Sequence, residues 1–103
     1  MTGIELITQE RKEQIEVHGK TPEYDHKHNL HRQLPYAVAI LTNTFLLVGL
    51  HYIPINWDET AWRKIHDKSY IERLTIAGAF CAAEIDRVQL ENEKHPITIT
   101  TEE

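Results

Sequence analysis

The sequence contains a single cysteine, Cys81, among its 103 residues. A disulfide within the chain is therefore excluded, and with it the class of small secreted domains that disulfides hold together. Residues 1–11 carry acidic and amide side chains where a signal peptide requires an apolar core, so no export signal is expected. Both observations predict a cytoplasmic protein.

Positive charge is also scarce. The chain has 11 lysine and arginine residues against 16 aspartate and glutamate residues, which gives a net charge of −5 at pH 7. A protein that binds nucleic acid in general needs a basic face that displaces counterions from the phosphates. Nucleic acid is therefore not an expected partner. A small phosphorylated ligand remains compatible, because it needs only a local basic cluster.

Several well-known catalytic motifs are missing. There is no glycine-rich phosphate loop, no Gly-x-Ser-x-Gly turn and no Cys–His pairing, so phosphate-loop and covalent-nucleophile chemistries have no support. His26, His28 and His31 follow Asp25 and would suffice in number for a zinc ion. No cysteine pair or His-Glu-x-x-His pattern accompanies them, so a solvated loop is the favoured interpretation and zinc the alternative.

One apolar stretch, residues 34–53, approaches the ~20 residues that span a membrane. Thr42, Asn43, Thr44 and His51 interrupt it. A buried core or interface helix is therefore favoured over a membrane helix, and no membrane partner is expected.

Cap and stop residues predict the helices. Thr2 is a suitable N-cap for a helix to about residue 17, with Gly19 as its stop residue. Residues 20–32 are expected to form a polar connector, and a second helix is expected over 34–50. Asp58 caps a short helix through residue 65, and Ser69 with Glu72 forms a capping box for a last helix that ends near 92–94.

These elements predict an all-α fold, a small bundle of three main helices plus a short one. Residues 1–95 form one helical domain, and residues 96–103 form a C-terminal tail. A domain of 103 residues buries only ~65% of its extended-chain surface, which makes it marginal as a monomer. We therefore expect oligomerisation to complete the bundle.

The last helix carries two acids, Glu84 and Asp86, in an otherwise apolar, small-residue stretch. At 100° per residue their directions differ by about 200°, so one metal ion cannot easily take both from the same helix. A site at Glu84 must then recruit groups from another helix or subunit. Gly78 and Ala82, four residues apart, would let such a helix approach closely, and an approach between subunits is expected.

The best candidates to join Glu84 lie on one face of the first helix: Glu10, Glu13 and Gln14. Simpler interpretations stay open for every acid. Glu84 can pair with Arg87 along its own helix, Asp86 can pair at a subunit contact, and Glu10 and Glu13 can be solvated.

Trp57 and Trp62 are the two tryptophans of the chain. Aromatic platforms of this kind stack on a nucleobase or a sugar. In a small helical protein, paired tryptophans more often lock a loop onto the core, and both interpretations are kept.

Three segments together resemble a known group. Glu10-Arg-Lys-Glu-Gln14, the run His18-Gly-Lys-Thr-Pro-Glu-Tyr-Asp25, and the helix from Leu74 to Arg87 are similar to segments of small phage and bacterial proteins of largely unassigned role. That group in turn resembles the MazG-like all-α nucleoside triphosphate pyrophosphohydrolases. Those enzymes are dimeric or tetrameric and bind magnesium through acids on two neighbouring helices. This chain departs from them, since its second helix has no acid and Gln33 stands near where related sequences carry Glu.

The resemblance implies a nucleotide-binding protein, with magnesium-dependent pyrophosphohydrolase activity as the first hypothesis. It implies Glu10 and Glu84 as catalytic residues, with the metal held by Glu10, Glu13 and Glu84 and by Asp86 from a partner subunit. Arg11, Lys64 and Arg87 would steady the phosphates, while Gln14 and Trp57 or Trp62 would contact the base. The incomplete acid set motivates two alternatives. One is a non-catalytic protein that binds or sequesters a nucleotide, for example for a phage countering host defence, and the other is a structural homo-oligomer.

Overall fold

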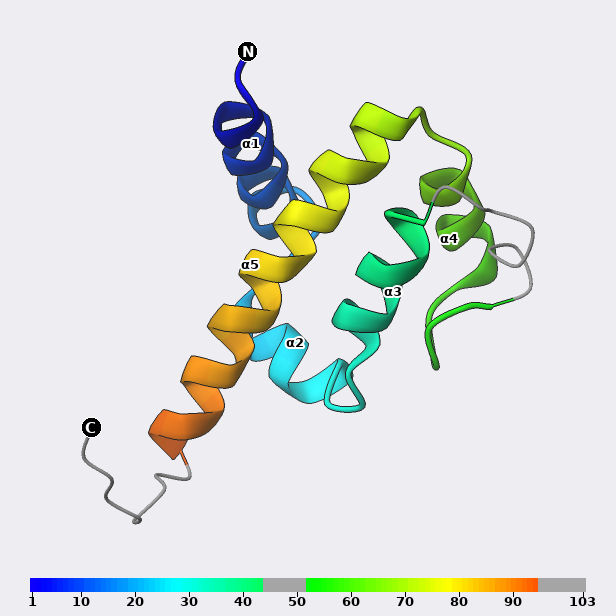
Figure 1. Cartoon of the computed structure of the whole chain (residues 1–103). Coiled ribbons are helices and arrows are strands. Elements are labelled where there is room, and N and C mark those ends of the chain that lie inside the picture. The colour runs from blue at the N-terminus through cyan, green and yellow to red at the C-terminus, as the bar shows by residue number, and fades with distance from the viewer. Residues whose placement is uncertain (44–51, 95–103) are drawn as a thin grey trace.

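The computed structural model describes residues 1–43 and 52–94, and all regular structure in these residues is helical (Figure 1). The described helices are α1 (Gly3–Glu16), α2 (Pro22–His28), α3 (Gln33–Leu41), α4 (Glu59–His66) and α5 (Tyr70–Lys94). The prediction of an all-α fold is confirmed. Completion of the bundle by oligomerisation stays a prediction, and the predicted tail, residues 96–103, lies outside the described residues.

Local capping chemistry sets the start of α1. The Thr2 hydroxyl accepts a hydrogen bond from the Glu5 amide at 3.2 Å, and the Thr2 amide donates to the Glu5 carboxylate at 2.8 Å. Two of the amides that a helix start leaves unpaired are thereby satisfied. After the helix, Gly19 has a φ of +67°, the left-handed conformation that glycine adopts without strain. Both predicted ends of the first helix are confirmed to within a residue or so.

Residues 20–32 are not a plain connector, and that prediction was wrong. They contain α2, whose N-cap Thr21 accepts a hydrogen bond from the Tyr24 amide at 3.1 Å. Pro22 occupies the first helical position, where a missing N–H is harmless and the fixed φ favours the helix. Acids in the first turn and basic residues in the last turn complement the helix dipole.

Within the described residues, α3 is shorter than predicted. It ends at Leu41 rather than near residue 50. The Leu41 carbonyl accepts a hydrogen bond from Arg73 Nη1 of α5 at 3.2 Å, so a side chain distant in sequence satisfies the end of the helix. The remainder of the predicted helix, residues 44–50, lies outside the described residues. No helix in the described part of the chain combines the length and apolarity that crossing a membrane requires.

The two remaining caps follow the prediction. Asp58 accepts a hydrogen bond from the Ala61 amide at 2.8 Å and starts α4. Ser69 and Glu72 bond each other's amides at 3.2 and 3.0 Å and start α5. The Glu72 carboxylate has a lowered pKa because it accepts the Ser69 backbone hydrogen bond.

The long helix α5 organises the molecule, since α1, α2 and α3 all pack against it (Figure 1). Its buried side joins α3 and α4 in one apolar core cluster, formed by Leu34, Ala37, Leu41, Trp62, Ile76, Ala77, Phe80 and Ala83. On another side, α1 approaches closely at Gly78, where an added Cβ would lie 2.5 Å from Ile7 Cδ1. The close helix approach that the small residues predict therefore occurs within the chain, between α5 and α1.

Candidate functional site

A cavity of about 1000 Å³ opens between α1, α2, α4 and α5, and we refer to it as the central cavity. Its wall combines aromatic, acidic, amide and basic side chains. The members that the sequence singled out are Glu10, Glu13, Gln14, Trp57, Trp62 and Lys64, and further lining residues include Lys20, Asp25, Asn29, Lys68 and Phe80. Five of the eight residues assigned to catalysis or ligand binding therefore share this cavity, whereas Arg11, Glu84 and Arg87 are not among its lining residues.

The aromatic part of the wall is tightly packed. The ring of Trp57 meets Trp62 edge to face at a centroid distance of 5.8 Å, and it meets Phe80 in the same way at 5.4 Å. Trp57 Nε1 also donates a 2.9 Å hydrogen bond to Oδ1 of Asn29, the C-cap residue of α2. Through these contacts Trp57 holds the segment before α4 against α2, α4 and α5. Of the two interpretations of the tryptophans, this is the one in which they lock a loop onto the core.

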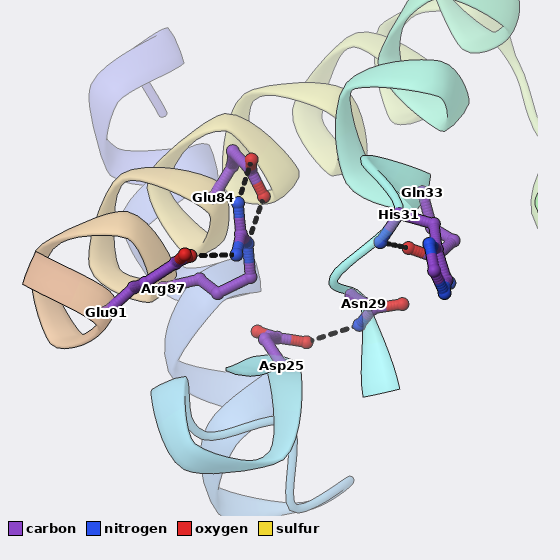
Figure 2. A network of polar contacts seen from close by, with 7 residues as sticks. All are labelled: Asp25, Asn29, His31, Gln33, Glu84, Arg87 and Glu91. Carbon is purple, nitrogen blue, oxygen red and sulfur yellow. Dashed lines mark hydrogen bonds and ion pairs between the residues drawn. The ribbon is translucent and has the colours of Figure 1, made fainter. Parts of the chain in front are cut away.

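Asn29 joins Trp57 to Asp25, which is only 2% exposed (Figure 2). Its Oδ1 accepts a 2.7 Å hydrogen bond from Asn29 Nδ2, and its Oδ2 has no hydrogen-bond partner among the described residues. Burial raises the pKa of the Asp25 carboxyl, although the hydrogen bond from Asn29 and the charges of Arg11 and Lys20 act in the opposite direction. Asp25 and Asn29 are four residues apart on the helix that the sequence analysis missed, so their pairing was missed with it.

On the α1 side, the predicted shared face is observed. Glu10, Glu13 and Gln14 all line the central cavity, and Gln14 Nε2 donates to Glu10 Oε2 at 3.2 Å. Gln14 is buried, Glu10 is half-buried and Glu13 is exposed. The solvated alternative therefore describes Glu13 better than Glu10.

Glu84 is engaged by a neighbour on its own helix (Figure 2). Arg87 Nε and Nη2 donate to the two Glu84 oxygens at 2.9 and 2.8 Å, while Arg87 Nη1 donates to Glu91 at 2.9 Å. The hydrogen bonds to Glu84 raise the pKa of Arg87. The simpler interpretation of Glu84, a local pair with Arg87, is the arrangement observed, and neither residue is among those that line the central cavity.

Arg11 connects α1 to two other parts of the chain. Its Nη1 donates to the Lys20 carbonyl at 3.0 Å, and its Nη2 donates to Asp86 Oδ2 of α5 at 3.2 Å. Asp86 thus has a partner within its own chain, and it turns away from the Glu84 pair as the helical angle predicts. In this arrangement the guanidinium groups of Arg11 and Arg87 are each bonded to a carboxylate and are not free to bind phosphate.

The acids that the sequence singled out do not come together in one cluster among the described residues. No group of three or more His, Cys, Asp or Glu side chains in the described ranges could hold a metal ion. A magnesium ion at Glu84 would compete with Arg87 for the carboxylate, and one at Asp86 would compete with Arg11. The assignment of Mg²⁺ to Glu10, Glu13, Glu84 and Asp86 therefore stays a prediction.

Contrary to the prediction, His26, His28 and His31 do not lie together in a loop. His26 and His28 lie on α2, and His31 lies in the segment between α2 and α3. The His28 ring stacks on Tyr24 at a centroid distance of 4.3 Å, and His28 and His31 line the central cavity.

Gln33 is a structural residue whose position the sequence did not explain. It is 1% exposed, its Nε2 donates to the carbonyls of His28 and Ile55 at 3.1 and 3.4 Å, and its Oε1 accepts from the His31 amide at 2.8 Å. These contacts need a donor and an acceptor on one side chain, which an amide provides and a carboxylate does not.

No protein-family model, curated protein or solved structure matches this chain. The resemblance to the MazG-like group therefore stays a prediction, and the function is argued from the cavity.

Proposed function

We propose that the chain binds a nucleotide or a nucleotide-derived small molecule in the central cavity, without hydrolysing it. One observation carries this proposal: indole rings and lysine ammonium groups line the same cavity. A nucleotide has a flat aromatic base and an anionic phosphate group, and these are the two kinds of surface that such a wall complements. A volume of about 1000 Å³ reaches the upper end of the range for small-molecule sites.

The wall also suggests how such a ligand lies. Trp57 is half-buried, so part of its ring remains available to a stacked base. Gln14 offers an amide that can both donate to and accept from a base edge. Lys20, in the turn between α1 and α2, and Lys64 of α4 contribute positive charge that can compensate phosphate charge.

Hydrolysis ranks second because the expected acids and cations are engaged elsewhere. Both oxygens of Glu84 accept hydrogen bonds from Arg87, and Arg11 bonds Asp86. Releasing these groups to hold magnesium and phosphate would break two ion pairs at the same time. Glu10 and Glu13 support the pyrophosphohydrolase hypothesis, since both line the central cavity.

Tryptophan fluorescence tests the binding. Both tryptophans of the chain line the central cavity, so a stacked base should quench their emission. The protein is titrated with ribo- and deoxynucleoside triphosphates in the presence of a chelator. Saturable quenching by at least one nucleotide, with matching heat in calorimetry, is expected. A panel that produces neither signal would contradict nucleotide binding.

A matched pair of lysine variants locates the site. Lys64→Ala removes an exposed lysine of the central cavity, whereas Lys12→Ala removes an exposed lysine outside it. Loss of one exposed charge contact should raise the Kd of a triphosphate by about two- to fivefold for Lys64→Ala. Lys12→Ala should leave the Kd unchanged, and an equal effect of both variants would show general attraction only.

A pyrophosphate assay separates binding from hydrolysis. Wild-type protein and Glu84→Gln are incubated with the nucleotides that bind, with magnesium or manganese present. No release above the Glu84→Gln level is expected for a binding protein. Release by wild type alone would establish the pyrophosphohydrolase hypothesis in its place.

A further inference from the structure

One face of α5 is apolar and largely exposed, and among the described residues Ile7 of α1 packs against it at Gly78. Its residues alternate at spacings of four and three: Leu74, Gly78, Cys81, Ile85 and Val88, which we call the α5 stripe. Ile85 is 58% exposed, Leu74 and Val88 are 39% and 38% exposed, and Cys81 is exposed as well. In Figure 1, α5 crosses the front of the molecule and no other element lies over it.

This pattern is that of a helix–helix seam. Spacings of four and three average 3.5 residues, the repeat that keeps an apolar row facing a partner helix in a coiled coil. The outer face of a helix in a soluble monomer normally carries charged residues instead. None of the five residues of the α5 stripe is charged, and the stripe extends over residues 74–88, a length of about 22 Å at 1.5 Å per residue.

The one gap in the row is filled. Gly78 has no side chain, but Ile7 of α1 occupies the adjacent space, where its Cδ1 and Cγ1 would lie 2.5 and 2.8 Å from an added Cβ. Ile7 remains half-buried, so it continues the apolar surface across the gap. The α5 stripe is therefore a continuous ridge that a second helix can follow along its length.

We propose that a second copy of this chain covers the α5 stripe, with the two α5 helices parallel and in register. A seam of this kind needs the same spacing on both helices, and α5 supplies it to itself. The next position in the repeat is Asn92. In register, the two copies of Asn92 face each other and their amides can hydrogen-bond, as a single polar seam residue often does.

The flanking charges favour the parallel arrangement over the antiparallel one. In register, Glu84 of one copy lies beside Gln89 of the other, a pair without repulsion. An antiparallel pair with the same seam would set Glu84 against Glu84 and Asn92 against Leu74. Like charges and a polar–apolar mismatch would then oppose pairing. The dimer does not depend on what the central cavity binds.

Solution mass and a matched pair of variants test the proposal. The chain has a mass of 12.0 kDa, so light scattering after gel filtration should give twice that mass for wild type at micromolar concentration. Ile85→Glu places a charge in the seam and should halve the mass. Ile55→Glu makes the same change at a site that is 57% exposed but lies off the stripe, and it should leave the dimer intact.

Cross-linking tests the register. In parallel helices the two Cys81 thiols face each other, and diamide should convert them to one disulfide by taking one hydrogen from each. The linked dimer should disappear in Cys81→Ser and in Ile85→Glu. Circular dichroism verifies that Ile85→Glu is folded, and Val88→Lys replaces it if it is not.

Three results would overturn the proposal. A monomeric wild type at 100 micromolar would exclude the dimer, as would a dimer that Ile85→Glu and Val88→Lys leave unchanged. A dimer that these variants dissociate but that forms no Cys81 disulfide would overturn the parallel register.

Discussion

Asp25 shows how one residue couples the interior of the molecule to pH. Its carboxyl group is nearly inaccessible to water, one oxygen is bonded to Asn29, and burial raises its pKa. Because the folded-state pKa lies above the unfolded-state pKa, the folded protein binds the Asp25 proton more tightly than the unfolded chain does. Ionised Asp25 therefore opposes folding, and this penalty is present at neutral pH.

We therefore expect mild acid to remove a destabilising contribution of Asp25 to the free energy of unfolding. As the pH falls from 7 through the raised pKa towards the ordinary range of aspartate, the penalty of Asp25 should disappear. The free energy of urea unfolding of wild type should then increase relative to that of Asp25→Asn, which cannot ionise. Glu23→Gln, an exposed acid on the same helix, serves as the control and should track wild type at every pH. If the free energy of unfolding of wild type instead decreased relative to that of Asp25→Asn as the pH falls, the raised pKa would be refuted.

Residue pairs were predictable only where they are local. Glu84 and Arg87 are three apart on one helix, and the sequence offered their pairing as the simpler interpretation. Arg11 and Asp86 are 75 positions apart, and nothing in the sequence favours that pair over others. The Asp25–Asn29–Trp57 chain joins α2 to the segment before α4, so it emerges only when both are placed.

At the scale of elements, α1 and α5 approach closely at Gly78, because glycine has no Cβ. An added Cβ at Gly78 would lie 2.5 Å from Ile7 Cδ1, closer than carbon atoms approach. Alanine in a helix interior is otherwise favoured over glycine by about 1 kcal/mol. The two effects oppose each other in Gly78→Ala, because Ile7 must shift to admit the new side chain.

A double-mutant cycle separates these effects. In an Ile7→Ala background, where the contacting atoms are gone, Gly78→Ala should stabilise the protein by about 1 kcal/mol. In the wild-type background the same substitution should stabilise it less or destabilise it. Chemical denaturation of the four proteins gives the coupling energy. Equal effects in both backgrounds would mean that α1 does not constrain Gly78.

Three helix starts were predictable, whereas the end of α3 and the whole of α2 were not, for physical reasons. The caps at Thr2, Asp58 and Ser69 depend on side chains within three residues, which the sequence displays directly. The end of α3 at Leu41 is satisfied by Arg73, 32 positions later. The helix α2 was overlooked because Thr21-Pro22 was interpreted as a turn signal, although Thr as N-cap with Pro at the first position also starts a helix.

At the scale of the whole molecule, the central cavity results from how four helices are placed. The sequence identified several of its lining residues, because Glu10, Gln14 and Trp57 carry recognisable chemistry. It could not show that Asp25 and Asn29 belong to the same space, since the helix α2 that places them was not predicted. It also assigned Arg87 to the phosphates and Glu84 to the metal and catalysis, whereas α5 carries them as a largely buried ion pair.

The arrangement around α5 also predicts that the described helices unfold together. Leu41 of α3 is completely buried and belongs to the same apolar cluster as Trp62 of α4 and Phe80 of α5. Leu41→Ala should therefore lower the free energy of unfolding by about 2–5 kcal/mol, while Leu30→Ala, the same change at an exposed site, should cost well under that amount. Because one cluster joins these helices, tryptophan fluorescence and far-ultraviolet circular dichroism should give coincident transitions in wild type and in both variants. A fluorescence transition that precedes the loss of helix would instead show that α4 detaches before α5 unfolds.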